Sequence, residues 1–205
     1  MMKVAVTGNV ASGKSTLSQI WARGGIPLVQ ADELAREVVE PGTEGLAAVV
    51  EAFGREILSE DGRLNRRALG ELVFGDPERR TRLEGILHPL ILACRNRWMA
   101  EREGEGVGLA VAEIPLLFET GLEGSVDVVV FVDAPHEERL RRLREDRGLE
   151  EDEAKRMMDA QISPEEKRAR ADYVVHNAGS LEDLEIRALA LLDLLLARSA
   201  GRKTL

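Results

Sequence analysis

Four residues near the start of the chain, Gly8, Gly13, Lys14 and Ser15, follow the phosphate-loop spacing G-x-x-x-x-G-K-[ST]. A glycine-rich turn before a helix points successive backbone N–H groups into one hollow, where the helix N-terminus adds partial positive charge. In such a loop the lysine reaches the β- and γ-phosphates, and the serine hydroxyl can ligate Mg²⁺. We therefore expect a nucleoside triphosphate and Mg²⁺ to bind at Ala11, Ser12, Gly13, Lys14, Ser15 and Thr16.

The residues on either side supply the context that this motif needs. Val4–Thr7 is a short apolar run that predicts a buried strand, and Ser15–Arg23 has the pattern of a helix. A chance match in a turn that happens to contain glycine is the alternative. The strand, turn and helix in this order favour a working phosphate loop.

Two acidic residues stand where predicted strands end. Asp32 follows the second strand and can accept the proton of an attacking hydroxyl or hold a Mg²⁺-bound water, although it could also cap the helix that begins near Glu33. Glu113 closes the third strand and could bond a substrate hydroxyl, a water on Mg²⁺ or Lys14. The alternative for Glu113 is a solvated strand end.

Two further candidates lie between these acids. His88 precedes Pro89, which is expected to end one helix or start the next, so this histidine could be structural or could touch a ligand. Arg66, with Arg67, begins a predicted helix and suits an anionic acceptor as well as an ordinary exposed surface.

The remaining apolar runs predict the fold. Each is rich in Val, Ile or Ala and nearly continuous, which is typical of parallel strands covered on both faces. Helical patterns separate them, so we expect an α/β fold with a doubly wound, five-stranded parallel sheet and ligands at the carboxyl ends of its strands. The predicted strands are Val4–Thr7, Ile26–Val29, Leu109–Ile114, Val126–Val132 and Tyr173–His176.

Two connections are too long for simple crossovers. We expect a nucleotide-binding core at 1–31, 107–135 and 172–205, a helical acceptor-binding insertion at 32–106, and a lid at 136–171. The lid is rich in arginine and poor in large apolar residues, so it should bury little and be mobile, unless it is a solvated helix laced with ion pairs. Four residue pairs are expected to break the helices of the insertion, namely Pro41-Gly42, Asp61-Gly62, Asp76-Pro77 and His88-Pro89.

Composition restricts the classes of partner. The 205 residues include 28 Lys and Arg against 37 Asp and Glu, a net charge of −9, and aromatic residues make up only 3%. These values argue against a nucleic-acid partner. Cys94 is the only cysteine, no secretory signal precedes the first strand, and the most apolar stretch is too short to span a bilayer. We expect a cytoplasmic protein that needs neither a membrane nor an obligate protein partner.

Several segments together resemble one family from end to end. The phosphate loop alone is shared by many kinases and ATPases, but the order and spacing of the other segments are specific to the dephospho-coenzyme A kinases. The segments are Thr7–Thr16, Ala31–Gly42, Arg66–Gly70, Val73-Phe74, Leu87–Ile91, Ile114–Glu119, Arg139–Leu143, Gln161 and Asn177–Gly179.

The resemblance implies that ATP phosphorylates the ribose 3′-hydroxyl of dephospho-CoA, the last step of coenzyme A synthesis. It also implies a nucleotide-binding core, a helical CoA-binding insertion and a lid. By carry-over, Asp32 looks like the catalytic base and His88 and Arg66 like acceptor-site residues. Arg142 looks like the lid arginine that closes on the phosphates, and Asn177 like an adenine-side contact.

The chain departs from the family pattern at several positions. Gln30 stands where the family usually has the first of two aspartates, and Glu113 replaces an aspartate. The order Asp146-Arg147 is the reverse of the usual one, which puts Arg147 in doubt as a ligand. Asn9 and Ala11 replace common glycines; both are expected to point outward and to be tolerated if their φ angles are negative.

Two other functions compete with this one. A kinase for another small acceptor, such as a nucleoside monophosphate, fits the phosphate loop, but the long insertion with its His-Pro segment argues against it. A nucleotide-gated switch belongs to a different class, and the Asp-x-x-Gly and Asn-Lys-x-Asp motifs of a GTPase switch are missing from the chain.

Overall fold

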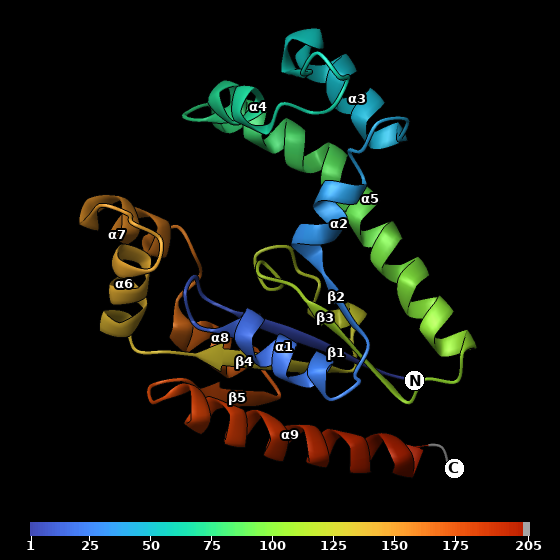
Figure 1. Ribbon diagram of the computed structural model, residues 1–205, viewed down its shortest axis with the longest axis vertical. Helices are drawn as coiled ribbons and strands as arrows, with labels where there is room; N and C mark the ends of the chain where they lie inside the picture. The colour runs from blue at the N-terminus through green and yellow to red at the C-terminus, as the bar shows by residue number, and fades with distance from the viewer. Residues whose placement is uncertain (203–205) are drawn as a thin grey trace. The chain divides into compact units, whose positions relative to one another are not determined.

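Five strands form one sheet in the order β2-β3-β1-β4-β5 in the computed structural model, which describes residues 1–202 (Figure 1). β1 pairs in parallel with β3 and β4, and β4 pairs in parallel with β5. The α/β fold with a five-stranded parallel sheet is therefore confirmed. The strands are β1 (Met2–Gly8), β2 (Leu28–Gln30), β3 (Leu109–Glu113), β4 (Val128–Asp133) and β5 (Tyr173–His176).

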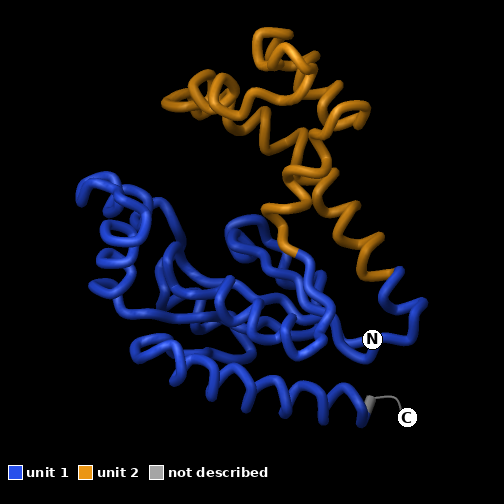
Figure 2. Tube along the Cα trace, in the orientation of Figure 1, with its two compact units in different colours: residues 1–29, 101–205 blue, residues 30–100 orange. Residues whose placement is uncertain are grey.

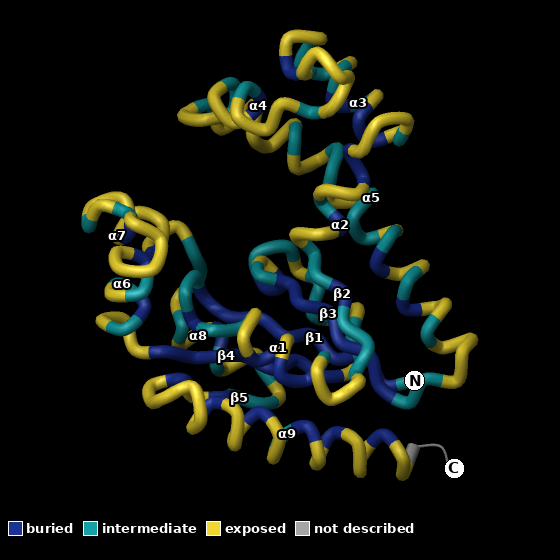
Figure 3. Tube along the Cα trace, viewed as in Figure 1, coloured by how far each residue is buried: buried dark blue, intermediate teal, exposed yellow. Residues whose placement is uncertain are grey.

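The central strands are buried on both faces, as their continuous apolar runs predict. Every residue of β3 and of β4 is buried, and β1 is buried at all positions except Lys3 (Figure 3). Because the strands are parallel, their carboxyl ends meet at one edge of the sheet. The register pairs Val6 with Glu113 and Gly8 with Val132 at that edge.

Two helices, α1 (Lys14–Arg23) and α9 (Leu181–Arg202), pack on one face of this sheet. The indole of Trp21 in α1 is fully buried, and its Nε1 donates a hydrogen bond of 2.8 Å to the carbonyl of Ala188 in α9. Leu17 of α1 and Leu195 of α9 belong to the same apolar cluster. The helix that follows the phosphate loop is therefore fixed to both the sheet and the last helix.

The chain divides into two units, residues 30–100 and the remainder (Figure 2). The unit 30–100 is helical and has its own apolar cluster, which includes the buried side chains of Val49, Ile57 and Leu69. Its elements are α2 (Ala31–Glu37), α3 (Glu44–Phe53), η1 (Arg55–Ile57), α4 (Arg66–Val73) and most of α5 (Pro77–Gly104).

One of the four expected helix breaks is wrong. α5 runs through His88 and Pro89 without ending, whereas the pair Asp76-Pro77 does mark its beginning. Proline removes one backbone hydrogen bond from a helix interior. Here Leu87, Leu90 and Ile91, which flank Pro89 on α5, pack against the apolar cluster of this unit and hold the helix in place. Tertiary packing therefore overrides the local signal.

The segment expected to be a lid holds three helices and a small apolar core. Its helices are α6 (His136–Glu145), α7 (Glu151–Asp159) and α8 (Pro164–Arg170). Leu143, Ala154 and Met158 are buried and pack with Val10 and Ala11 of the phosphate loop. The expectation that this segment buries little is therefore wrong for α6 and α7, because their few apolar residues share one face.

Replacing Trp21 with phenylalanine should destabilise the sheet unit. The Ala188 carbonyl loses a buried donor, and an unmade buried hydrogen bond costs about 1–3 kcal/mol. The free energy of unfolding from denaturant titration measures this. Ile186→Ala is the control, because this side chain lies on α9 and is 62% exposed, so its loss should change stability by less than about 0.5 kcal/mol. Equal losses in the two variants would contradict the role of Trp21.

Candidate active site

The loop between β1 and α1 leaves the first N–H groups of α1 without a side-chain cap. Gly13 is the N-cap residue, with a left-handed backbone (φ 95°), and no side chain bonds to the free amides. Most helix N-termini are capped by a Ser, Thr, Asp or Asn side chain. An uncapped N-terminus that carries no acidic residue in its first turn is suited to bind an anion.

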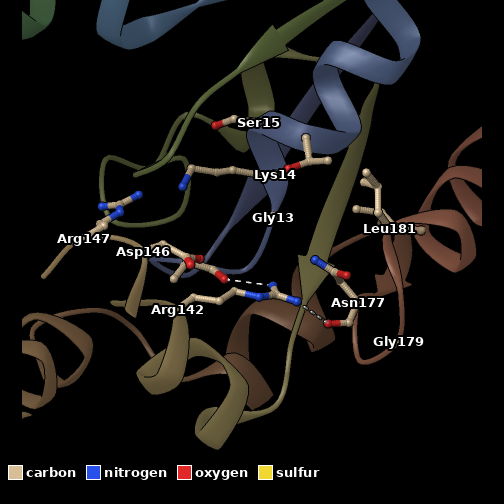
Figure 4. Close-up of a pocket in the computed structure, with 12 residues that line it drawn as sticks. Gly13, Lys14, Ser15, Arg142, Asp146, Arg147, Asn177, Gly179 and Leu181 are labelled. Atoms are coloured by element: carbon tan, nitrogen blue, oxygen red, sulfur yellow. Dashed lines mark hydrogen bonds between the residues drawn. The ribbon is translucent and has the colours of Figure 1, made fainter. Parts of the chain in front are cut away.

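A pocket of about 320 Å³ opens at this helix end (Figure 4). The cationic groups of Lys14, Arg142 and Arg147 line it, against the single acidic side chain of Asp146. The pocket therefore combines backbone amides with excess positive charge, as a polyphosphate requires. Its lining residues are Ala11, Gly13, Lys14, Ser15, Thr16, Arg142, Asp146, Arg147, Asn177, Gly179, Leu181 and Leu184.

Two side chains from elsewhere in this unit hold the loop by its carbonyl groups. Arg142 Nη1 donates to the carbonyl of Ala11 at 3.1 Å, and Asn177 Nδ2 donates to the carbonyl of Ser12 at 2.8 Å. Arg142 also reaches the carbonyl of Asn177 at 3.5 Å, and Figure 4 marks both of its bonds with dashed lines. Residues far apart in the sequence therefore fix one loop while its amides stay available.

Glu138 anchors Arg142 from the other side. Its carboxylate accepts from Arg142 Nε at 3.0 Å and also pairs with Arg141. The hydrogen bond from Arg141, together with the charge of Arg142, lowers the pKa of Glu138 to about 2. Glu138 is therefore ionised at neutral pH, and it orients the guanidinium of Arg142 at the pocket wall.

Glu113 is buried rather than a solvated strand end. The residue is 3% exposed, and its Oε1 accepts a hydrogen bond of 2.5 Å from the hydroxyl of Ser15. Its Oε2 is buried and has no hydrogen-bond partner within residues 1–202. The structure thus joins the predicted acid to the predicted metal-binding serine, which the sequence could not do because 98 positions separate them.

Arg147 lies at the pocket despite the reversed order of Asp146 and Arg147. Its side chain extends toward Lys14 in Figure 4. Gly179, Leu181 and Leu184 are further lining residues that sequence reasoning did not assign. The only sequence signal for these three residues is their position along the chain. Gly179 is the last residue of a segment that resembles the family, and α9 begins two residues after it.

Ser12 is the one expected phosphate-loop residue that does not line the pocket, since it is fully buried behind it. Two other expectations about this loop are wrong. Ala11 has a positive φ of 59°, which is strained for an alanine, and Asn9 is 2% exposed and points inward. The Asn9 side chain donates to the carbonyl of Ile162 at 3.0 Å.

The three residues expected on the acceptor side, Asp32, Arg66 and His88, all lie in the helical unit of residues 30–100. Asp32 is exposed in the first turn of α2, whose N-cap residue is Gln30, so the interpretation of Asp32 as the cap is wrong. Helical geometry begins directly after β2, two residues earlier than a cap at Asp32 would need. Its carboxylate is therefore not used by the end of its own helix.

The other two candidates of this unit are also exposed. Arg66 is the first residue of α4, whose cap Asn65 accepts from the N–H of Ala68 at 3.0 Å. A cation at a helix N-terminus opposes the helix dipole, so Arg66 does not stabilise α4. His88 lies within α5, one residue before Pro89, and is likewise open to a ligand.

No group of three or more His, Cys, Asp or Glu side chains gathers as a metal site within residues 1–202. Over the same residues, no helix is both long and apolar enough to cross a membrane.

A parallel sheet with an uncapped, glycine-rich phosphate loop and a cationic pocket defines the chain as a nucleotide-binding protein of the P-loop class. The family model for dephospho-CoA kinase matches residues 2–183. The chain belongs to the dephospho-CoA kinase family.

Relatives and solved structures agree along nearly the whole chain. The dephospho-CoA kinase of Frankia casuarinae is 48% identical over 204 residues, covering 100% of this chain and 88% of the relative. That of Corynebacterium glutamicum is 44% identical and covers 90% of this chain and 95% of the relative. A crystal structure of a Thermus thermophilus protein is 42% identical, with a TM-score of 0.79 and coverage of 95% and 97%. The dephospho-CoA kinase of Campylobacter jejuni is 29% identical, with a TM-score of 0.74 and 98% of each chain covered.

Gly13→Ala should weaken ATP binding by at least about 10-fold, since it costs the loop a buried hydrogen bond. An added Cβ would lie 2.2 Å from Nδ2 of Asn177, so the bond from Asn177 to Ser12 must break. Calorimetric titration with ATP measures the loss.

Gly25→Ala is the matched control for that variant. Gly25 also has a left-handed backbone (φ +84°), but nothing lies within 4 Å of its added Cβ. It should lose about 1–2 kcal/mol of stability through backbone strain and keep its affinity for ATP. If both variants bound ATP equally well, the contact between Gly13 and Asn177 would not matter for the nucleotide.

Proposed function

We propose that this chain transfers the γ-phosphoryl group of ATP to the ribose 3′-hydroxyl of dephospho-CoA, giving CoA and ADP. The observation that carries the proposal is the family match over residues 2–183, together with the uncapped phosphate loop in the same chain. The nucleotide site rests on the loop and its pocket, and the kinase class rests on the family match. The acceptor rests on the family.

The donor side is proposed from the pocket residues. The amides of the phosphate loop bind the β-phosphate, and Lys14 neutralises charge between the β- and γ-phosphates. Arg142 and Arg147 add positive charge at the same pocket. The adenosine end extends toward Asn177, Gly179 and Leu181, where the pocket turns partly apolar.

Mg²⁺ is the proposed cofactor, and the residues present fit it. Mg²⁺ prefers oxygen ligands and usually keeps several waters beside substrate phosphates, so a cluster of three protein ligands is not needed. The Ser15 hydroxyl would ligate the ion, and Glu113 would hold one of its waters through the carboxylate oxygen that has no partner. When bound, the ion neutralises charge on the β- and γ-phosphates.

The acceptor side is proposed from the helical unit. Asp32 is the catalytic base, and Arg66 and His88 contact the acceptor. All three are exposed, and Asp32 and Arg66 are not needed to stabilise their own helices. Of the roles expected for Glu113, its bond to Ser15 favours holding a water on Mg²⁺ over binding a substrate hydroxyl.

The chemistry then follows the general course of phosphoryl transfer. The acceptor oxygen attacks the γ-phosphorus in line with the leaving ADP oxygen, and its proton passes to the carboxylate of Asp32. Positioning and charge neutralisation supply most of the rate, because the transition state spreads negative charge over the phosphoryl oxygens. Lys14 and Arg142 act on that charge.

ATP and dephospho-CoA are the proposed partners, and the proposed location is the cytoplasm, where the family's role in coenzyme A synthesis places both. We propose no nucleic-acid, membrane or obligate protein partner.

ADP release should depend on dephospho-CoA. A coupled assay with ATP and Mg²⁺ should show rapid ADP release with dephospho-CoA and only slow release without an acceptor or with a nucleoside monophosphate. A phosphate on the 3′-oxygen, detected by mass spectrometry, identifies the product. Slow release that ignores every acceptor would favour a nucleotide-gated switch, and a faster rate with a nucleoside monophosphate would reassign the acceptor.

Asp32→Asn should lower kcat by about 10²–10⁴-fold, the range expected for a general base. The amide keeps the size of the side chain but cannot take the proton. ATP affinity should not change, and raising Mg²⁺ should not restore the rate. Glu33→Gln is the control, since it removes a neighbouring exposed carboxylate in the same turn. A fully active Asp32→Asn variant would exclude this base.

Arg142→Ala should depress kcat by about 10²-fold or more, and more strongly than it changes the KM for the acceptor, because its charge acts mainly in the transition state. Arg144→Ala is the matched control on the same helix. Its side chain is 53% exposed and pairs with Glu151 at 3.2 Å, so its loss should be nearly silent in steady-state kinetics. Equal effects would mean that α6 is an ordinary solvated helix.

A further inference from the structure

The chain segment that follows α7 is hydrogen-bonded to the beginning of the phosphate loop. Val10 N–H donates to Gln161 Oε1 at 2.7 Å, and Asn9 Nδ2 donates to the carbonyl of Ile162 at 3.0 Å. The residues of these pairs are 151 and 153 positions apart, so both contacts are tertiary. Two adjacent residues of the loop therefore donate to two adjacent residues of the segment that follows α7.

A buried ion pair holds this segment from behind. Ile162 N–H donates to Glu119 Oε1 at 3.3 Å, and Nζ of Lys167 lies 2.6 Å from the same oxygen. Lys167 is fully buried, and the side chain of Glu119 is only 18% exposed. A buried charge that lost its partner would be strongly destabilising, so the pair keeps Glu119, and with it Ile162, in one place.

The contact occupies an amide that the nucleotide does not need. Val10 is not among the pocket-lining residues, whereas Ala11 and Gly13 to Thr16 are. Arg142 and Asn177 already fix the carbonyls of Ala11 and Ser12. Among the described residues, the polar contacts that hold Asn9 and Val10 from outside the loop come from the segment at Gln161, while Val10 also packs against the apolar core of α6 and α7.

We propose that Gln161 and Asn9 are positioning residues for the phosphate donor. Together they fix the first half of the phosphate loop in the conformation that presents its other amides to ATP. They also join that loop to the segment that follows α7. The helix pair α6–α7 is thus attached to the loop at two places, through Arg142 on α6 and through Gln161 after α7. This inference deepens the proposed function, since it concerns the nucleotide site of the same reaction.

Preorganisation is the physical basis of the effect. A loop that is free to move must be ordered when ATP binds, and that ordering reduces affinity without changing any contact to the ligand. Losing the hydrogen bond between Gln161 and the Val10 amide should therefore reduce the binding constant for ATP by a factor between about 5 and about 100. The effect should therefore appear in ATP affinity and in the KM for ATP, and not in the KM for the acceptor.

Two variants of Gln161 separate the hydrogen bond from the shape of the side chain. Gln161→Met keeps the length but loses the oxygen that accepts from Val10, and Gln161→Glu keeps an accepting oxygen. ATP binding is measured by calorimetric titration without acceptor, so the result does not depend on whether dephospho-CoA is the acceptor. We expect Gln161→Met to bind ATP between about 5- and about 100-fold more weakly and Gln161→Glu to stay within about 3-fold of the parent.

A double-mutant cycle with Asn9 tests whether the two residues act on one contact. Asn9→Ala should weaken ATP binding as well, and the combined Asn9→Ala, Gln161→Met variant should lose less than the product of the two single losses. Arg156→Ala is the control, because Arg156 is exposed on α7 and its side chain contacts no loop residue among those described. That variant should bind ATP as the parent does.

Three results would overturn the proposal. The first is a Gln161→Met variant with lowered melting temperature but unchanged ATP affinity, which would make the contact purely structural. The second is an equal loss in Gln161→Glu and Gln161→Met, and the third is an equal loss in Arg156→Ala. If Gln161→Met does not fold, Asn9→Gly carries the same test, because it removes the bond to Ile162 with a residue that this type of loop accommodates.

Discussion

The phosphate loop can bind an anion because the start of α1 has no side-chain cap while two of the loop's carbonyl groups are held. Arg142 and Asn177 donate to the carbonyls of Ala11 and Ser12, and these two bonds fix the loop next to the start of α1. Gly13 has to be glycine for this arrangement, since a side chain there would collide with Asn177. The uncapped start of α1 and the cationic pocket depend on these few bonds, because a loop without them would have to be ordered by the ligand itself.

The surrounding fold supplies those donors from distant parts of the chain. Asn177 follows β5, and its own N–H donates to the carbonyl of Asp133 at the end of β4. Arg142 is oriented by Glu138, whose pKa Arg141 and Arg142 lower to about 2, so that this carboxylate stays ionised well below neutral pH. The parallel sheet brings its strand ends to one edge, so groups with no proximity in sequence meet at one loop.

Charge within this unit is arranged in two different ways. At the pocket, Lys14, Arg142 and Arg147 outnumber the single acid Asp146, which leaves positive charge for a polyphosphate. Behind the loop, the buried Lys167 and the half-buried Glu119 neutralise each other. The first arrangement favours ligand binding, whereas the second fixes the position of a chain segment. Both use the same residue types, and burial with pairing is what separates the two roles.

The sequence by itself determined the sheet, the phosphate loop and the family, because these depend on local spacing and on continuous apolar runs. The apolar runs predicted the ends of all five strands to within two residues, and the loop spacing identified Lys14 and Ser15 as phosphate-loop residues. Only the tertiary structure decided which partners those residues have. Glu113 meets Ser15, Asn9 turns inward to Ile162, and α5 continues through Pro89. Each of these outcomes depends on contacts between residues far apart in the chain or on packing that overrides a local signal, and residue spacing carries no information about either.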